Sequence, residues 1–202
     1  MTAVGALAMD ALASTPWQWS GDASDVIRLR QRALAIPVQS VSASALTDSF
    51  RQSRDSGARG HEALDIPAPL GTPVIAVQDG RIAKLFLSQP GGITVYEFDP
   101  AREFVYYYAH LARYAEGLKE GMAVRRGDII GYVGSTGNAS SREPHLHFAV
   151  FRLGPERQWW GGKPINPFDI WRVQPPPISR SSASENQGMQ AVRPQATNSA
   201  PR

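Results

Sequence analysis

Hydrophobic and polar residues alternate through the middle of this chain, and this period of two predicts β-strands. The apolar runs are rich in β-branched and aromatic residues, and they are bounded by glycine, proline and aspartate, which favour turns. The strands expected from this pattern cover residues 63–66, 74–77, 81–87, 93–98, 103–110, 129–134 and 145–151. Between residues 118 and 128 the pattern indicates one further short strand flanked by turns.

Two short turn sequences predict which of these strands pair with each other. Asp79-Gly80 separates two apolar runs, and an Asp-Gly pair is typical of a tight hairpin. Asp99-Pro100 separates the next two apolar runs in the same way. We therefore expect two hairpins within a body that is mainly antiparallel.

Helix signals are confined to the start of the chain, where residues 25–34 could form a short amphipathic helix. We interpret residues 1–35 as an N-terminal segment, either this short helix or the remnant of an export sequence, and residues 36–173 as one β-domain. Residues 174–202 are rich in Pro, Ser and Gln and poor in large apolar side chains. Such a composition cannot offset the entropy of ordering the chain, so we expect a disordered tail.

The amino-acid composition further limits the possible fold and chemistry. The 202 residues are 42% hydrophobic and include 18 glycines and 16 prolines, which favours an all-β fold such as a small β-sandwich or split barrel. The absence of cysteine excludes disulfides, thiolate catalysis and zinc sites with cysteine ligands. No apolar run approaches the roughly 18 residues of a membrane helix, so we expect no transmembrane segment in this chain.

The net charge of +3 is modest, and residues 174–202 supply two of these charges through three arginines and one glutamate. The expected β-domain is therefore nearly neutral. A protein that binds nucleic acid usually carries a clustered basic face. We accordingly expect no nucleic-acid partner.

The candidate chemistry centres on the sequence from Glu143 to Phe148, Glu-Pro-His-Leu-His-Phe. Side chains of a strand alternate between its two faces. His145 and His147 should therefore share one face, with Leu146 and Phe148 on the other. Two imidazoles on one face of an apolar strand are costly to bury without partners. A metal ion is one such partner, although two polar groups on an exposed strand edge are an alternative reading.

A second group of candidate ligands lies upstream, in His61-Glu62-Ala63-Leu64-Asp65. His61 and Asp65 are four residues apart, and this even separation puts both on one face of a strand. Together with one of the strand histidines they form a set of two histidines and one carboxylate. Nitrogen and oxygen ligands with a vacant fourth position are typical of catalytic zinc.

Several motifs together resemble the lysostaphin-type (LytM-type) zinc metallopeptidases, over roughly residues 36–171. They occur in the family's order: His61–Asp65, Gly71-Thr72-Pro73-Val74, Tyr108-Ala109-His110-Leu111, Gly127-Asp128-Ile129-Ile130-Gly131, Gly134-Ser135-Thr136-Gly137 and His145-Leu146-His147. The resemblance implies a mainly antiparallel β fold with an active-site groove. It also implies hydrolysis of peptide bonds in bacterial cell-wall peptidoglycan. One departure is Ala63, where the family often has glycine.

Matched residue by residue, the resemblance implies that His61, Asp65 and His147 bind Zn²⁺. It implies that His145 is the general base, and that His110 either stabilises the developing oxyanion or positions water. The expected partners are peptidoglycan peptides, the expected location is periplasmic or extracellular, and the chain is expected to be a monomer. A module of the same fold that binds cell wall or activates another hydrolase, without catalysis, is the alternative.

Overall fold

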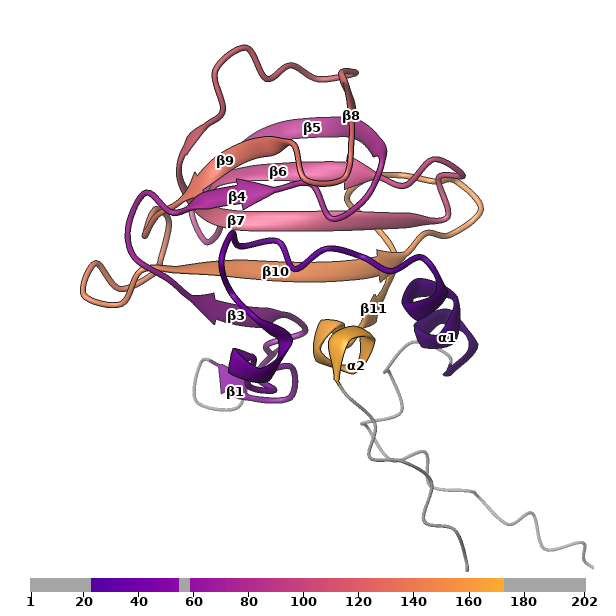
Figure 1. Cartoon of the computed structure of the whole chain (residues 1–202), viewed down its shortest axis with the longest axis horizontal. Coiled ribbons are helices and arrows are strands. Elements are labelled where there is room, and N and C mark those ends of the chain that lie inside the picture. The colour runs from indigo at the N-terminus through magenta and orange to yellow at the C-terminus, as the bar shows by residue number, and fades with distance from the viewer. Residues whose placement is uncertain (1–22, 55–58, 173–202) are drawn as a thin grey trace, which may run out of the picture.

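Antiparallel strands dominate the computed structural model, which describes residues 23–54 and 59–172 (Figure 1). The strands are β1 (Ser53–Arg54), β2 (Arg59–Gly60), β3 (Leu64–Pro67), β4 (Pro73–Ile75), β5 (Gly80–Ser88), β6 (Gly92–Phe98), β7 (Phe104–Tyr114), β8 (Ala123–Val124), β9 (Ile129–Val133), β10 (His145–Arg152) and β11 (Lys163–Ile165). The helices are α1 (Ala23–Gln31), the 3-10 helix η1 (Ala43–Ala45) and α2 (Pro167–Trp171).

Nine of these strands form one sheet, and β1 and β2 form a separate pair. The main path of the nine-stranded sheet runs β11-β10-β7-β6-β5-β8. Outside this path, β3 pairs with β10, β9 pairs with β7, and β4 pairs with β9. Figure 1 shows the four long strands β5, β6, β7 and β10 lying side by side, with β4 and β9 in front of them. The predicted fold class, mainly antiparallel β with little helix, is confirmed.

One of the two predicted hairpins is present and the other is wrong. β6 and β7 pair around Asp99-Pro100, as expected. β4 does not pair with β5 across Asp79-Gly80; it pairs with β9. Gly80 instead begins β5, and a Cβ at this position would lie only 2.5 Å from the carbonyl oxygen of Phe98. Glycine is therefore required here for the close approach of β5 and β6, in addition to any turn.

The alternation of side chains along β7 and β10 divides the molecule into a core face and an opposite face. Leu146, Phe148 and Val150 of β10 are fully buried on the core face. Tyr106 and Tyr108 of β7 are buried in the same core. The intervening residues of both strands point the other way. The histidines of β10 therefore lie on the face of the sheet that the core does not occupy.

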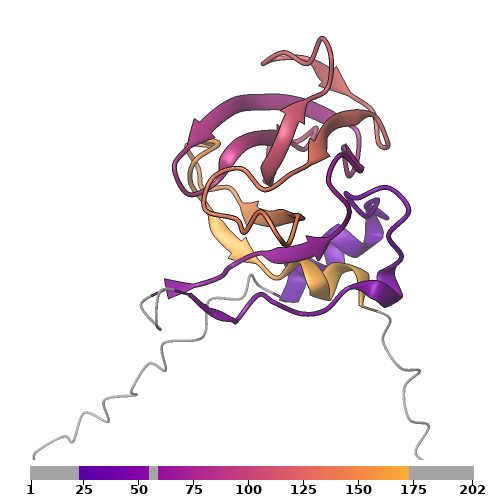
Figure 2. The ribbon, with the colours of Figure 1, turned by 90° about the vertical axis from the view of Figure 1, so that its left-hand side faces the viewer.

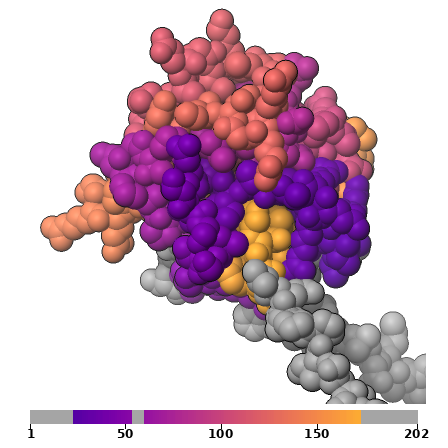
Figure 3. Space-filling view, in the orientation of Figure 1, coloured from indigo at the N-terminus to yellow at the C-terminus, as the bar shows by residue number. Residues whose placement is uncertain are grey.

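The N-terminal helix α1 packs against the β body. Leu29 of α1 is fully buried in the common core. Beyond the helix, Arg32 forms an ion pair with the buried Asp99, with an N–O distance of 2.9 Å. Figure 1 shows α1 and α2 below β10 at one end of the body, and Figures 2 and 3 show the same indigo and yellow segments close together at that end. Residues 1–22 and the predicted tail at 174–202 lie outside the described residues.

The segment after β10 adds an edge strand and ends in a helix. Residues 159–168 include β11 and the start of α2. Asn166 caps this helix by accepting a hydrogen bond from the backbone N–H of Phe168. The ring of Trp171 packs on Phe148, and its N–H donates to the carbonyl of Leu34. Within the described ranges, none of the helices has the length and apolar character needed to cross a membrane.

A carboxylic acid is buried within the core of the sheet. Glu97 of β6 is fully buried, and its Oε2 accepts a hydrogen bond of 2.6 Å from the hydroxyl of Tyr108. Its Oε1 has no hydrogen-bond partner among the described residues. Burial raises the pKa of Glu97 to about 8, although the Tyr108 hydrogen bond opposes this shift. The side chain is therefore mostly protonated at neutral pH.

Replacing Glu97 by glutamine tests this assignment through the pH dependence of stability. The pKa of this carboxyl is about 8 in the folded chain and 4.5 in the unfolded chain. Between these pH values the chain therefore takes up a proton at Glu97 when it folds. The contribution of this group to the free energy of unfolding is fully present below pH 4.5 and is lost as the pH rises towards 8. Because of this group, the free energy of unfolding falls by at most about 1.4 kcal/mol per pH unit.

We therefore expect the free energy of unfolding of Glu97→Gln to fall less steeply than that of the wild type between pH 5 and 8, as measured by urea titration. The metal content of the two proteins must be the same in these titrations. Parallel pH profiles would show that Glu97 is ionised in the folded protein.

Candidate metal centre

The register between β3 and β10 brings two of the predicted ligands together. Asp65 lies directly opposite His147 in this antiparallel pair. His61 precedes β3, and its Nε2 lies 2.9 Å from Asp65 Oδ1 and 3.0 Å from His147 Nδ1. Asp65 Oδ1 and His147 Nδ1 are 3.1 Å apart. Two imidazole nitrogens and one carboxylate oxygen thus form a small triangle on the face of the sheet opposite the core.

This triangle fits a divalent metal ion such as zinc. Ligands held about 2.0–2.2 Å from zinc in tetrahedral geometry are separated from one another by roughly 3.3–3.6 Å. The three donor atoms already approach this spacing. Nitrogen and oxygen donors without cysteine suit zinc, and three protein ligands leave a fourth position for water or substrate. His61, Asp65 and His147 are therefore able to hold a metal ion.

Ser49 positions two of the three donors. The carbonyl of Ser49 accepts a hydrogen bond of 2.9 Å from Nδ1 of His61, so the Nδ1 of His61 carries the proton and Nε2 is free to bind metal. The hydroxyl of Ser49 accepts a hydrogen bond of 2.9 Å from the backbone N–H of Asp65. The sequence did not single out Ser49, because a lone buried serine has no distinguishing pattern.

The protonation states of the donors suit metal binding. Burial alone would raise the pKa of Asp65, but the hydrogen bonds with His147 and His61 outweigh it and hold this pKa well below its usual range. Burial lowers the pKa of His147, although the neighbouring Asp65 opposes the shift. Metal ligands must be an ionised carboxylate and neutral imidazoles. The lowered pKa values of Asp65 and His147 both favour these forms.

His145 lies beside the triangle. Its Nδ1 donates a hydrogen bond of 2.8 Å to the carbonyl of Glu143. Its Nε2 is 3.8 Å from Asp65 Oδ1, farther than the other two histidines. Because Nδ1 carries the proton, Nε2 is left with a lone pair that can accept another. His145 and His147 share a face of β10, as predicted, but they stand in different positions relative to the donor triangle.

His110 lies at a bend in β7. The first part of this strand pairs with β10 as far as Ala109, and from Leu111 onward it pairs with β9. His110 occupies the junction and has a φ of 59°. This backbone conformation is unfavourable for residues other than glycine. A bulge of this kind re-aims a side chain. The ring of His110 is thereby placed 5.0 Å from that of His145 and 5.5 Å from that of His147, measured between centroids.

Thr136 holds the ring of His110 in this orientation. The carbonyl of Thr136 accepts a hydrogen bond of 2.8 Å from Nδ1 of His110. The hydroxyl of Thr136 donates to the carbonyl of Leu111 and accepts from the N–H of Ile93, so it links three segments. Burial lowers the pKa of His110 to about 4, although the hydrogen bond to Thr136 opposes this shift. His110 is therefore neutral at pH 7, with its proton on Nδ1.

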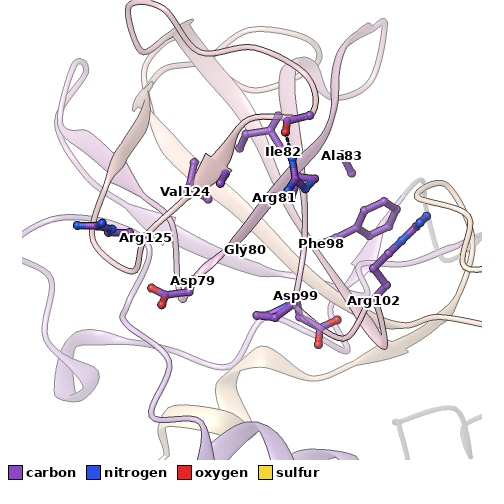
Figure 4. A pocket seen from close by; sticks show the side chains of 13 residues that line it. Asp79, Gly80, Arg81, Ile82, Ala83, Phe98, Asp99, Arg102, Val124 and Arg125 are labelled. Carbon is purple, nitrogen blue, oxygen red and sulfur yellow. Dashed lines mark hydrogen bonds between the residues drawn. The ribbon is translucent and has the colours of Figure 1, made fainter.

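A separate cavity of about 610 Å³ opens between β5, β6 and β8, and none of the five predicted site residues lines it. Figure 4 shows Arg102 and Arg125 at opposite sides of this cavity and pointing away from each other. Arg81 is occupied by a hydrogen bond to the carbonyl of Gly121. The basic side chains therefore do not converge on one ligand. Of these two places, the histidine cluster is the one that brings metal-binding side chains together.

The fold and the histidine cluster define a class of metallopeptidase, and comparison with known proteins identifies the family. Residues 59–167 match Peptidase family M23. The match covers more than half of the chain, so the chain belongs to peptidase family M23. The resemblance to lysostaphin-type peptidases that the sequence motifs predicted is thus confirmed.

Individual relatives agree with this assignment. The chain is 31% identical over 144 residues to an L-Ala–D-Glu endopeptidase from Bacillus subtilis, covering 66% of this chain and 42% of that protein. It is 38% identical over 91 residues to lysostaphin from Staphylococcus staphylolyticus, covering 44% of this chain and 18% of that protein. The chain thus spans less than half the length of these relatives.

A solved structure shows the same fold. The crystal structure of a zinc-containing peptidase from Vibrio cholerae matches with a TM-score of 0.54 and 23% sequence identity, covering 71% of this chain and 41% of that one.

The role of Thr136 is open to a direct test with two substitutions. Thr136→Val keeps the shape of the side chain but removes both hydrogen bonds of the hydroxyl. We expect it to lower the free energy of unfolding by about 1–3 kcal/mol, as measured by urea denaturation. Thr136→Ser retains the hydroxyl and should stay close to the wild type. Bound metal should be unchanged in both variants, because Thr136 contacts none of the three donors; equal stability of the two variants would contradict this role.

Proposed function

We propose that this chain is a zinc-dependent endopeptidase that hydrolyses peptide bonds in bacterial cell-wall peptidoglycan. The observation that supports this most directly is the convergence of His61, Asp65 and His147, whose donor atoms lie 2.9–3.1 Å apart. His145 and His110 stand next to this triangle with their ring protons held by backbone carbonyls. This arrangement offers both a metal site and groups for proton transfer.

The proposed mechanism divides the work between the metal and the two other histidines. A zinc ion at the three donors would supply a Lewis acid that polarises the scissile carbonyl and acidifies water. His145 acts as general base, because Nδ1 is committed to Glu143 and Nε2 is free to take a proton. After the attack, the same nitrogen returns the proton to the leaving amine. His145 thereby serves in both halves of the reaction.

The hydrogen bonds of His110 favour one of its two expected roles. A neutral imidazole with its proton on Nδ1 has only an acceptor left at Nε2. An acceptor cannot stabilise a developing oxyanion, but it can orient a water molecule by accepting one of its hydrogens. We therefore propose that His110 positions the attacking water, and that its low pKa keeps it in the accepting form throughout the neutral range.

The substrate class and setting follow from the relatives. The Bacillus subtilis relative is named for cleavage between L-Ala and D-Glu, and the other relative is lysostaphin. We propose that peptidoglycan peptides are the substrate and that the protein acts in the cell envelope as a monomer. The proposed catalytic domain is residues 36–173, with α1 packed against it. A non-catalytic module of this fold is the alternative, and the full set of donors argues against it.

The division of labour between the two β10 histidines predicts opposite effects of two matched substitutions. His147→Ala removes one of three donors, so the purified protein should lose its zinc at neutral pH. His145→Ala should retain stoichiometric zinc but lose about 10²–10⁴-fold in turnover, because only the base is removed. Elemental analysis and peptidase assays on the same preparations separate the two effects. Loss of zinc from His145→Ala, with retention in His147→Ala, would reverse the assignment.

Digestion of intact muropeptides, followed by mass spectrometry, tests the proposed function as a whole. The wild type should release defined peptide fragments, lose this activity in a chelator, and regain it on addition of zinc. The masses of the fragments identify the bond that is cleaved. Binding to cell walls without any fragments, in zinc-loaded protein, would support the non-catalytic module and reject the hydrolase.

A further inference from the structure

A row of aromatic rings leads away from the metal centre along the same face of the sheet. We use the name aromatic row for Tyr107, Tyr96, Trp159, Phe86 and Trp160. It begins at the site itself, where the ring centroid of Tyr107 is 6.0 Å from that of His147. Tyr96 lies opposite Tyr107 in the β6–β7 pair, and their centroids are 4.6 Å apart.

The row continues from β6 onto the segment that follows β10. The centroid of Trp159 is 4.7 Å from that of Tyr96. Beyond it, Phe86 of β5 and Trp160 lie 5.6 Å and 5.2 Å from Trp159. The row is thus continuous from a proposed metal ligand to Trp159, where it branches to Phe86 and Trp160.

The two ends of the row differ in exposure. Tyr96 and Trp159 pack on a small second cluster formed by Phe98, Val105 and Leu153, which anchors the middle of the row. Trp160 and Phe86 at the outer end are 63% and 40% exposed. Packing on the second cluster accounts for the positions of Tyr96 and Trp159, but it does not account for the exposed rings of Phe86 and Trp160. Exposed aromatic rings joined to an active site are typical of ligand contact surfaces.

The chemistry of the row favours an uncharged, partly apolar ligand. Its members supply ring faces, two tyrosine hydroxyls and two indole N–H groups, and none of them is charged. The lysine opposite Tyr96 on β5, Lys84, is paired with Glu120 at an N–O distance of 2.8 Å. Sugar rings fit this surface, because the C–H face of a pyranose stacks on an aromatic face while its hydroxyl and acetamido groups form hydrogen bonds. Peptide stems rich in carboxylates and amines would require charged partners.

We propose that the aromatic row binds the N-acetylated sugar rings of the glycan strand that carries the peptide cleaved at the metal centre. This inference rests on the proposed function, since it names the second component of the same substrate. The row extends the site from the peptide to the sugar backbone. The enzyme therefore selects peptides that are still attached to glycan over free peptides.

Binding of a soluble sugar probe tests the row without any need for hydrolysis. The 202-residue chain is titrated with tetra-N-acetylchitotetraose, an oligomer of N-acetylglucosamine, in a calorimeter. Trp160→Ala and Phe86→Ala should each weaken binding roughly tenfold, which corresponds to the loss of one aromatic contact. Leu87→Ala is the matched control, because Leu87 is 71% exposed and next to Phe86 but on the opposite face of β5. Circular dichroism confirms that each variant is folded.

Two results would overturn the inference: no binding of the oligosaccharide by the wild type, or equal losses in Leu87→Ala and Trp160→Ala. Kinetics supply a second arm, with a stem peptide linked to its disaccharide and the same peptide without sugar. Trp160→Ala should raise KM more for the sugar-bearing substrate. Equal increases for both would show that the row binds peptide and would also reject the inference. If the wild type cleaves neither substrate, the proposed function fails, and the titration still decides the role of the row.

Discussion

The antiparallel pairing of β3 with β10 is the constraint on which the candidate site depends. It places Asp65 directly opposite His147. Because side chains alternate with a period of two, a slip of one residue would move the carboxylate to the core face and the apolar neighbours to the site. Leu64 and Ile66, buried in the core, hold the register by hydrophobic burial. The same burial that stabilises the sheet therefore also aligns the donors.

A second constraint is the bend at His110. A φ of 59° at a non-glycine residue carries a local cost of about 1–3 kcal/mol, and it persists only where the surroundings determine it. The N–H of His110 is bound to the carbonyl of Gly91, and its ring is bound to Thr136. A Cβ on Gly92 would lie 2.2 Å from the hydroxyl oxygen of Thr136, so this contact requires glycine. The strained histidine is thus held by a backbone hydrogen bond and by Thr136, whose close approach to Gly92 depends on glycine.

The sequence predicted those parts of the structure that depend on local periodicity. His145 and His147 on one face, with Leu146 and Phe148 in the core, follow from alternation along a single strand. The pairing of β4 could not be predicted from Asp79-Gly80, because its partner β9 lies more than fifty residues further along the chain. Ser49 and Thr136 were missed for a related reason. They act through backbone carbonyls on residues distant in sequence, and such contacts leave no pattern.

Side-chain size on the site face links the metal centre to the aromatic row. Ala109 lies opposite His147, and Ala149 lies opposite Tyr107, in the β7–β10 pair. Both alanines are almost fully buried. Directly opposed side chains have Cβ atoms only about 4.5–5.5 Å apart. A larger residue at Ala109 would therefore compete with the imidazole of His147 for space, whereas the next position along β7 on this face is Tyr107. Small side chains at the centre and large rings beyond it are consistent with one surface that serves two parts of a substrate.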